Sequence, residues 1–247
     1  MIRLSVNLNK IATLRNSRGG HVPSVLDATR ACVEAGAPGV TVHPRADARH
    51  ITETDVREVS ALLRDLGSHT EYNIEGDPRP DLIALVLELR PTQCTLVPVR
   101  PGEITSQAGW PADTPRTAIA SAIDHLRTAG IRVSVFVEAD EAPIRWAKDV
   151  GADRVELYTE PYARAFERGT AAADASFRAY VAASEFAHSL GLGINAGHDL
   201  DLANLVLFRT LPHLEEVSIG HALISHALFV GLDRSVREYL SALRAPS

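Results

Sequence analysis

The 247-residue sequence contains little of what marks secreted, membrane-spanning or nucleic-acid-binding proteins. Its two cysteines, Cys32 and Cys94, are too few for a disulfide framework and neither belongs to a CxxC pair, which indicates the reducing cytoplasm. We expect no secretory leader, because the first residues lack its basic-then-apolar layout, and no apolar run approaches the roughly 20 residues that span a bilayer. The formal net charge of −6 argues against nucleic-acid binding, which normally needs a basic face.

Lysine is scarce as well, and the basic side chains are unevenly placed. Lys10 and Lys148 stand beside 23 arginines. The first fifty residues carry seven basic side chains against three acidic ones, in a chain that is acidic overall. Such a cluster indicates an anion-binding site, although on counts alone chance explains it equally well. A lone lysine can also form a Schiff base, so Lys10 is either an anion contact, which we favour, or a nucleophile.

A weak internal repeat organises the chain. Gly36, Gly130, Gly151 and Gly191 each end a helical stretch and precede a short apolar run, as expected where a helix ends before a buried strand. Extending this pattern predicts eight strands: Leu4–Val6, Val40–Val42, Tyr72–Ile74, Cys94–Val97, Val133–Val137, Val155–Tyr158, Leu192–Ile194 and Glu216–Ile219. Amphipathic stretches predict helices at Val56–Leu66, Asp81–Leu89, Thr117–Ala129, Ala142–Val150, Ala173–Leu190 and Ala222–Leu243.

The spacing of these strands favours a (β/α)8 TIM barrel. Eight units in 247 residues average about 31 residues each, the size of one βα unit. Short buried strands that alternate with helices form a parallel sheet, and eight such units match the closed barrel. An open, doubly wound sheet is the main rival, but no G-x-G-x-x-G follows the first strand. Because no linker divides the chain, we expect residues 1–247 to form a single α/β domain.

Such a barrel carries its chemistry at the carboxyl ends of its strands, and nearly every predicted strand here ends in a polar residue. These residues are Asn7, His43, Glu75, Thr105 in the loop after the fourth strand, Glu138, Glu156, Asn195, His198 and Gly220-His221. If Glu75 lies in the barrel mouth rather than in a solvated loop, lost solvation raises its pKa toward the range of a useful base. Glu156 points inward if Val155 and Leu157 face the helices, and it then serves either catalysis or a structural ion pair.

Two segments suit bound anions. His43, which titrates near neutral pH, precedes Arg45 and His50 in one loop. An arginine there suits a phosphate or carboxylate held by two hydrogen bonds, unless the loop is simply solvated. The last two strands end in Asn195–His198 and Gly220-His221. Barrels often bind phosphate at the ends of these two strands, through backbone N–H groups and a helix N-terminus. The alternative for each histidine is a buried, hydrogen-bonded core residue.

At these positions the sequence resembles the pyridoxine 5'-phosphate synthase family of the deoxyxylulose-phosphate-dependent vitamin B6 pathway. The similar stretches cover nearly the whole chain in order and are together very specific: Val6-Asn7, Ala12–Gly19, Gly39–Arg45, Arg49–Thr52, Asn73–Glu75, Leu96–Pro98, Asn195–His198 and Ile219–Ala222. The resemblance implies a homo-octamer of closed barrels that condenses 1-deoxy-D-xylulose 5-phosphate with 3-amino-2-oxopropyl phosphate. It implies the products pyridoxine 5'-phosphate, inorganic phosphate and water, and no metal or organic cofactor.

The resemblance also implies roles for individual residues. His43 and Glu75 match the acid/base residues, and His198 matches a proton donor. Glu156 matches a residue that stabilises the transition state. The positions similar to contacts of the amino-ketone phosphate are Asn7, Arg18, Gly220 and His221. Those similar to contacts of the deoxyxylulose phosphate are Arg45, His50 and Thr105.

Three residues depart from the family pattern. The family commonly has Asp-His after the first-strand asparagine, where this chain has Asn9 and Lys10. It often has glycine after the strand-seven histidine, where this chain has Asp199. Asn9 keeps hydrogen-bonding capacity without charge, and Lys10 supplies a cationic donor to a phosphate. Asp199 still offers its backbone N–H, so we expect all three to contact substrate.

Two other functions stay open at this point. One is a barrel aldolase or isomerase that acts on another sugar phosphate, through Lys10 or through a metal held by His43, His198 and Glu75. The other is a paralogue that binds phosphorylated metabolites without turnover. Building an aromatic ring from two small ketones needs several proton transfers, so the number of titratable groups at the strand ends favours the synthase.

Overall fold

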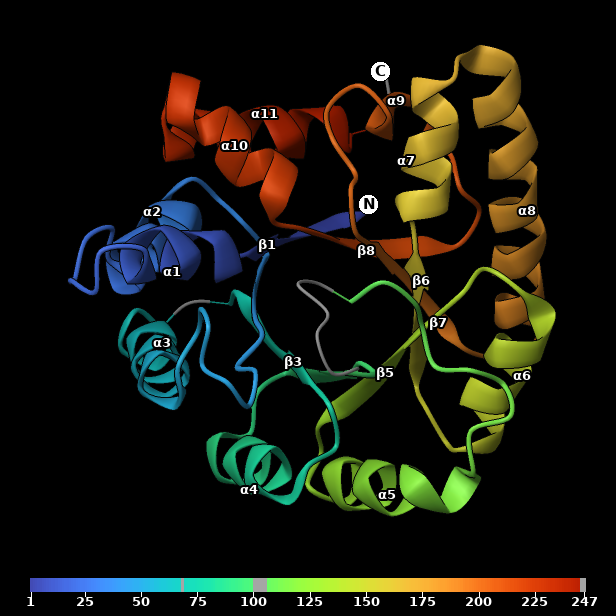
Figure 1. Ribbon diagram of the computed structural model, residues 1–247, viewed down its shortest axis with the longest axis horizontal. Helices are drawn as coiled ribbons and strands as arrows, with labels where there is room; N and C mark the ends of the chain where they lie inside the picture. Colours follow the sequence, from blue (N-terminus) through green and yellow to red (C-terminus); the bar gives the residue numbers. More distant parts are fainter. Residues whose placement is uncertain (68, 100–105, 245–247) are drawn as a thin grey trace.

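The eight predicted apolar runs form the strands of a closed parallel barrel, which confirms the predicted (β/α)8 fold (Figure 1). This computed structural model describes residues 1–67, 69–99 and 106–244. Each strand pairs with the next along the chain, and β8 pairs with β1. The strands are β1 (Arg3–Asn7), β2 (Gly39–Val42), β3 (Glu71–Gly76), β4 (Gln93–Leu96), β5 (Arg132–Val137), β6 (Arg154–Tyr158), β7 (Gly193–Gly197) and β8 (Leu214–Ile219).

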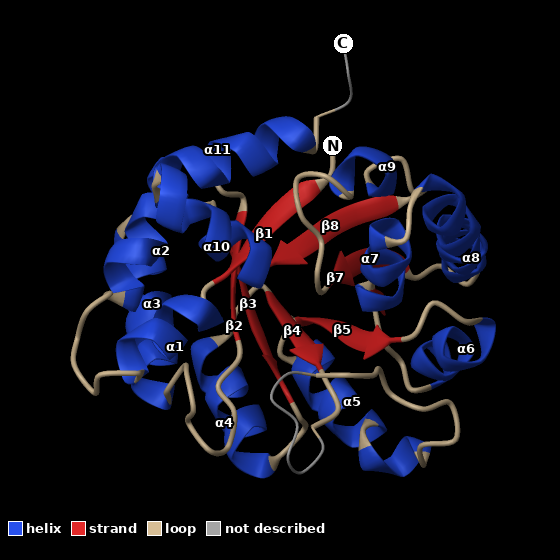
Figure 2. Cartoon of the chain, turned by 45° about the horizontal axis from the view of Figure 1, so that its top comes forward, coloured by secondary structure: helices blue, strands red, loops and turns tan. Residues whose placement is uncertain are grey.

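Helices form an outer layer around the barrel, as Figure 2 shows. They are α1 (Asn9–Asn16), α2 (Val25–Glu34), α3 (Glu53–Asp65), α4 (Pro80–Leu89), α5 (Ala120–Thr128), α6 (Glu141–Asp149), α7 (Glu160–Glu167), α8 (Thr170–Ser189), α9 (Leu205–Phe208), α10 (His221–Val230) and α11 (Leu232–Ala242), with a 3₁₀ turn at Arg116–Ala118. The prediction of one helix over Ala222–Leu243 is wrong, because Gly231 has a φ of +86° and separates α10 from α11. Within the described ranges, no helix is both long and apolar enough to cross a membrane.

The apolar pattern does not predict α1, α2, α7 or α9. The first of these begins two residues after β1, and only Ile11 and Ala12 of its eight residues are buried, so its amphipathic signal is weak. In α2 the Ser24 side chain accepts a hydrogen bond from the backbone N–H of Asp27 (3.1 Å), which caps the helix. Both helices lie beside α3 on one side of the barrel (Figure 1). They therefore flank the end of the barrel where β1 and β2 finish.

Polar side chains fill the inside of the barrel, where branched apolar residues are more usual. Ser5, Thr41, Asn73 and Thr95 are buried and form a chain of hydrogen bonds of 2.7–3.2 Å across β1 to β4. Alternate residues such as Val40 are also buried and belong to the apolar core beneath the helices. The apolar core thus lies between strands and helices, and the barrel axis is available for polar groups.

Ion pairs close the amino-terminal end of the barrel. Glu71 accepts hydrogen bonds from Arg3 (2.6 Å) and from Arg132. Arg154 donates to Glu215 (2.5 Å). All of these residues except Glu215 stand at the first position of a strand. Charged groups therefore neutralise one another at this end, and the opposite end carries the cavity described next.

Candidate active site

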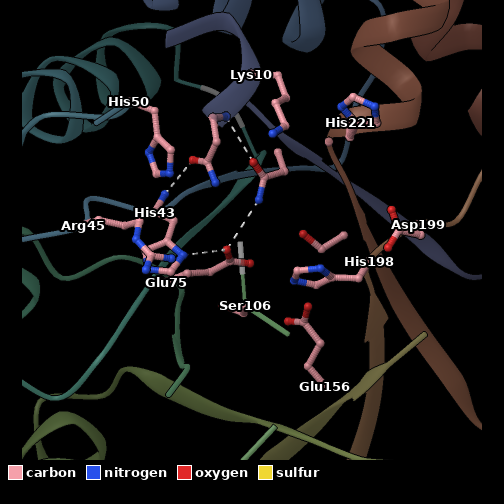
Figure 3. Close-up of a pocket in the computed structure, with 14 residues that line it drawn as sticks. Lys10, His43, Arg45, His50, Glu75, Ser106, Glu156, His198, Asp199 and His221 are labelled. Carbon is pink, nitrogen blue, oxygen red and sulfur yellow. Dashed lines mark hydrogen bonds and ion pairs between the residues drawn. The ribbon is translucent and has the colours of Figure 1, made fainter. Parts of the chain in front are cut away.

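A cavity of about 320 Å³ opens at the carboxyl ends of the strands. Its size suits a small metabolite. Figure 3 shows the side chains of Lys10, Glu75 and Glu156 converging on it from different strand ends. The lining residues are Asn7, Asn9, Lys10, His43, Arg45, His50, Glu75, Ser106, Glu156, His198, Asp199, Ser218, Gly220 and His221. Twelve of the fourteen site residues predicted from the sequence therefore lie together.

Two predicted residues are not part of this lining. Arg18 is exposed in the turn after α1. Thr105 lies outside the described residues. Conversely, Ser106 and Ser218 line the cavity without having been predicted. Ser218 stands two residues before Gly220, so the alternation along β8 could have revealed it. Ser106 follows the fourth strand in a loop, and no sequence pattern marks it.

Glu75 and His43 form the centre of the cavity wall contributed by β2 and β3. His43 Nδ1 lies 3.8 Å from Glu75 Oε2, which also accepts a hydrogen bond from Asn7 Nδ2 (3.4 Å). Burial, helped by the charge of Glu216, raises the pKa of Glu75 to about 8. Burial, together with the neighbouring His50 and Arg45, lowers the pKa of His43 well below its usual value. Near neutral pH the pair therefore holds a carboxyl that can donate a proton and an imidazole that can accept one.

Asn9 fixes the backbone on which His43 stands. Its Oδ1 accepts a hydrogen bond from the His43 backbone N–H (2.9 Å), and its own N–H donates to Asn7 Oδ1 (3.0 Å). Asn9 thus ties the end of β1 to the end of β2. The residue predicted as a substrate contact also holds a catalytic candidate in place.

His50 offers a hydrogen-bond donor to the cavity. Its Nδ1 accepts from the backbone N–H of Ile51 (2.9 Å), which leaves the proton of the neutral ring on Nε2. Burial and the charge of Arg45 lower the pKa of His50 to about 4, so the ring is neutral at physiological pH. Arg45 is itself 6% exposed and lines the same wall. Together they form a donor-rich site for an anionic or hydroxyl-bearing group.

The side chain of Glu156 points inward, as expected, and lines the cavity. Its Oε2 has no hydrogen-bond partner in the described part of the chain, and burial, reinforced by Glu75 and Glu216, raises the pKa of Glu156 well above the usual range. Gly197 stands beside it on β7, where any Cβ would collide with Glu156 Oε1. The backbone therefore makes room for a protonated carboxyl that faces the cavity.

His198 and Asp199 follow directly in a strained turn. Their φ angles are +82° and +56°, a region that residues other than glycine rarely adopt. Thr159 Oγ1 donates to the Gly197 carbonyl (2.6 Å) and to the His198 carbonyl, and the His198 ring packs on Phe136 with ring centroids 5.1 Å apart. Burial lowers the pKa of His198, so its imidazole is neutral at physiological pH. Strain of this kind is typical of residues held for function.

The opposite wall has the features of an anion site. Gly220 precedes α10, whose N-terminus faces the cavity, and a Cβ at Gly220 would lie 3.0 Å from the Asn7 Cβ. Figure 3 shows Lys10 and His221 beside this helix start. Backbone N–H groups at a helix N-terminus and a lysine ammonium both attract phosphate. Among the described residues, no group of three histidine, cysteine, aspartate or glutamate side chains is arranged to hold a metal ion.

Comparisons with known proteins agree with this geometry. The sequence model of the family described as "Pyridoxal phosphate biosynthesis protein PdxJ" matches residues 4–245. The chain is 52% identical over 245 residues to a pyridoxine 5'-phosphate synthase of Bacteroides fragilis and 51% identical to one of Bacteroides thetaiotaomicron, covering 99% of this chain and all of either relative.

Solved structures support the fold alone. A crystal structure of tryptophan synthase from M. tuberculosis superposes with a TM-score of 0.66 over 99% of this chain and 93% of that one, at 12% identity. At so low an identity, this likeness shows a shared barrel and says nothing of substrate. The family is shown instead by the sequence match, which runs through almost every residue from β1 to α11. The chain belongs to the family of the pyridoxal phosphate biosynthesis protein PdxJ.

Proposed function

We propose that this protein is a pyridoxine 5'-phosphate synthase, carried by a single domain over residues 1–247. It condenses 1-deoxy-D-xylulose 5-phosphate with 3-amino-2-oxopropyl phosphate and releases pyridoxine 5'-phosphate, inorganic phosphate and water. The observation that carries the proposal is the convergence of four titratable groups, buried His43, Glu75 and Glu156 and half-buried His198, in one cavity between two anion sites. The identity of about half the residues to curated synthases supports the same activity.

The proposed chemistry needs several proton transfers, and the cavity supplies groups for them. Carbonyl addition, dehydration, phosphate loss and ring closure each add or remove a proton. Glu75, with a pKa of about 8, and neutral His43 serve as acid and base on one wall. On the other side the neutral His198 first takes up a proton and then donates it in a later step, and the protonated Glu156 stabilises a developing negative charge by donating a hydrogen bond. No step in this scheme calls for a metal or organic cofactor.

The two phosphorylated substrates use the two anion sites. Asn7, Gly220 and His221 contact the amino-ketone phosphate at the start of α10, and Arg18 is a further proposed contact. Arg45, His50 and Thr105 contact the deoxyxylulose phosphate. Lys10 lies between these groups in Figure 3, so its ammonium adds charge for a phosphate. Asn9 holds the His43 backbone, and the backbone N–H of Asp199 completes the substrate contacts.

The proposal includes a homo-octamer in the cytoplasm. The assembly follows from the family resemblance. The compartment is supported by Cys32 and Cys94, which are both free and buried, as suits a reducing environment. Neither nucleic acid nor membrane is a proposed partner.

The decisive experiment incubates the purified protein with both substrates and quantifies pyridoxine 5'-phosphate by chromatography. The wild type should form product, and Glu75→Gln should lower kcat by about 10²–10⁴-fold, the usual worth of an acid/base group. Glu88→Gln is the matched control, because Glu88 is exposed on α4 and forms an ion pair with Arg57 away from the cavity. Absence of product from the folded wild type, at any ratio of the two substrates, refutes the proposal. Substrate binding without product would identify a non-catalytic paralogue instead.

An aldolase is the second candidate, because Lys10 lines the same cavity as the acid/base residues. A Schiff base between Lys10 and a ketone phosphate is trapped covalently by borohydride. Mass spectrometry of the treated protein should show no substrate-dependent adduct on Lys10 if the synthase proposal is right. An adduct there, with no pyridoxine 5'-phosphate formed, favours the aldolase.

A further inference from the structure

Glu216 is a buried carboxylate on β8 that lies below the cavity without lining it. It is 4% exposed. Its Oε1 accepts hydrogen bonds from Gln93 Nε2 (3.3 Å) and Asn195 Nδ2 (3.4 Å), and its Oε2 lies 3.7 Å from Arg3 Nη2. These partners come from β4, β7 and β1. Because β4 is not a neighbour of β8 in the barrel, the Glu216 carboxylate must occupy the inside of the barrel.

The strand register places Glu216 in the same row as a cavity residue. Asn195 of β7 pairs with Glu156 on one side and with Glu216 on the other. Glu156 and Glu216 are therefore separated by a single strand, and both side chains point inward. Glu75 enters the same interior from β3, two residues after Asn73. Asn73 pairs with Gln93 of β4, and Gln93 is the residue that donates a hydrogen bond to Glu216. Three carboxyl groups thus share one water-poor space.

We infer that Glu216 is a positioning residue for the proposed reaction: its fixed negative charge below the cavity opposes ionisation of Glu75 and Glu156, so that both keep the protons that the chemistry uses. This inference rests on the proposed function for its catalytic consequence. Its electrostatic part concerns the free protein and stands by itself.

The surrounding charges decide which carboxyl ionises first. Arg3 and Arg132 are already bound to Glu71, and Arg154 to Glu215, and these guanidinium groups all lie at the amino-terminal end. Glu216 reaches that layer through Arg3, whereas Glu75 and Glu156 line the cavity. The charged groups that act on Glu216 from the packed elements are Arg3 on β1, Glu71 and Glu75 on β3, Arg132 on β5, and Arg154 and Glu156 on β6. When Glu216 is ionised, this layer has no net charge, because the three guanidinium groups offset the carboxylates of Glu71, Glu215 and Glu216.

The directions of the pKa shifts agree with the order in which we expect the three carboxyl groups to ionise. Burial raises the pKa of Glu216, but Arg3, Arg132 and Arg154 act against the shift. For Glu75 and Glu156, burial and the charge of Glu216 act in the same direction, and both raise the pKa. Glu216 therefore ionises at lower pH than the two cavity carboxyls, and its charge is present when they titrate.

The test compares Glu216→Gln with the wild type by carbon-13 NMR of δ-labelled glutamate, with Glu75→Gln and Glu156→Gln used to assign the signals. Glutamine keeps the size of the side chain and an oxygen acceptor. In Glu216→Gln the cavity carboxyls should titrate roughly one to two pH units lower than in the wild type, as expected for removal of a unit charge in a partly shielded interior. The alkaline limb of kcat for pyridoxine 5'-phosphate formation should move down by the same amount, with KM nearly unchanged.

Glu215→Gln is the matched control. Glu215 precedes Glu216 on β8 at the β7–β8 register shift, but it binds Arg154 and its side chain is 44% exposed. Removal of the Glu215 charge should leave the pKa values of Glu75 and Glu156 unchanged. Glu216→Asp keeps the charge and should restore a titration close to that of the wild type.

Each outcome separates this inference from the proposed function. An unchanged titration of Glu75 and Glu156 in folded Glu216→Gln overturns the role of Glu216. If that variant does not fold, the wild-type spectra decide, because Glu216 must ionise before the other two, and a Glu216 still protonated when Glu75 ionises overturns the role as well. A shifted titration in a protein that makes no product supports Glu216 and refutes the synthase.

Discussion

Carboxylates at the two ends of the barrel stand in opposite surroundings. At the amino-terminal end Glu71 binds Arg3 and Arg132, and Glu215 binds Arg154. At the carboxyl-terminal end, among the residues that the structure describes, Glu156 has an oxygen without a hydrogen-bond partner, and Glu75 contacts the Asn7 amide and the His43 imidazole. Both ends are enclosed by the same eight strands and the same helical layer.

The difference lies in how each end deals with the cost of burying charge. At the amino-terminal end each carboxylate is partly exposed and has an arginine partner, which offsets the cost of removing its charge from water. A carboxyl without such a partner stays protonated, as the raised pKa values of Glu75 and Glu156 show. When the pH is above the ordinary pKa of such a group, keeping the group protonated in the folded state lowers the stability of the protein. The group gains reactivity in return, and this trade-off between stability and activity is common at functional sites. Substitutions at either end of the barrel test this division.

The largest effect should come from Glu156→Gln. A carboxamide is a weaker hydrogen-bond donor than a carboxylic acid and stabilises the developing negative charge less, so kcat for product formation should fall by about 10²–10³-fold. The melting temperature should stay equal or rise, because folding at neutral pH no longer has to protonate a buried carboxyl. Steady-state kinetics and calorimetry on the same preparation give both values. A variant that loses stability while keeping its activity would place Glu156 with the structural carboxylates instead.

The next effect concerns the pH dependence of folding. Glu75 has a pKa of about 8 in the folded protein against an ordinary value of 4.5, so the folded state binds more protons between these limits. Stability from this group is therefore present below pH 4.5 and is lost as pH rises toward 8, by up to about 5 kcal/mol. Urea denaturation of wild type and Glu75→Gln should diverge in the variant's favour across this window. Parallel curves would show that Glu75 is ionised in the folded state.

The smallest effect should come from Glu71→Gln at the opposite end. This substitution removes the charge that Arg3 and Arg132 share, and hydrogen bonds to charged groups are worth about 1.5–3 kcal/mol. We expect a loss of unfolding free energy of that size, with kcat within about twofold of the wild type. Denaturation and kinetics at neutral pH measure the two quantities. A large loss of kcat in the folded variant would mean that the two ends are not separate in function.

Much of the fold follows from local patterns. Glycine followed by a short apolar run locates four of the strands, further apolar runs locate the other four, and the mean spacing of βα units identifies the barrel. The break at Gly231 was missed because the apolar pattern of α10 and α11 continues through it. The eight-residue α1 was missed because it buries too little surface to produce a clear period.

The candidate site is predictable to the extent that strand ends reveal it. Position alone identified Glu75 and Glu156, and the alternation along β6 gave the inward direction of Glu156. Glu216 was not recognised, because its role depends on Gln93 and Asn195, which are distant in sequence and meet it only inside the closed barrel. Arg79 was missed for the same reason: it donates to the Pro44 carbonyl (2.7 Å) beside His43, and no local pattern links the two loops.

The reaction that we propose for the cavity joins two phosphorylated ketones into one ring. The most direct measurement is phosphorus-31 NMR of the purified protein with 1-deoxy-D-xylulose 5-phosphate and 3-amino-2-oxopropyl phosphate. Pyridoxine 5'-phosphate and inorganic phosphate should appear together in equal amounts, and only when both substrates are present. Phosphate released without pyridoxine 5'-phosphate, or no change in either substrate, would contradict the claim.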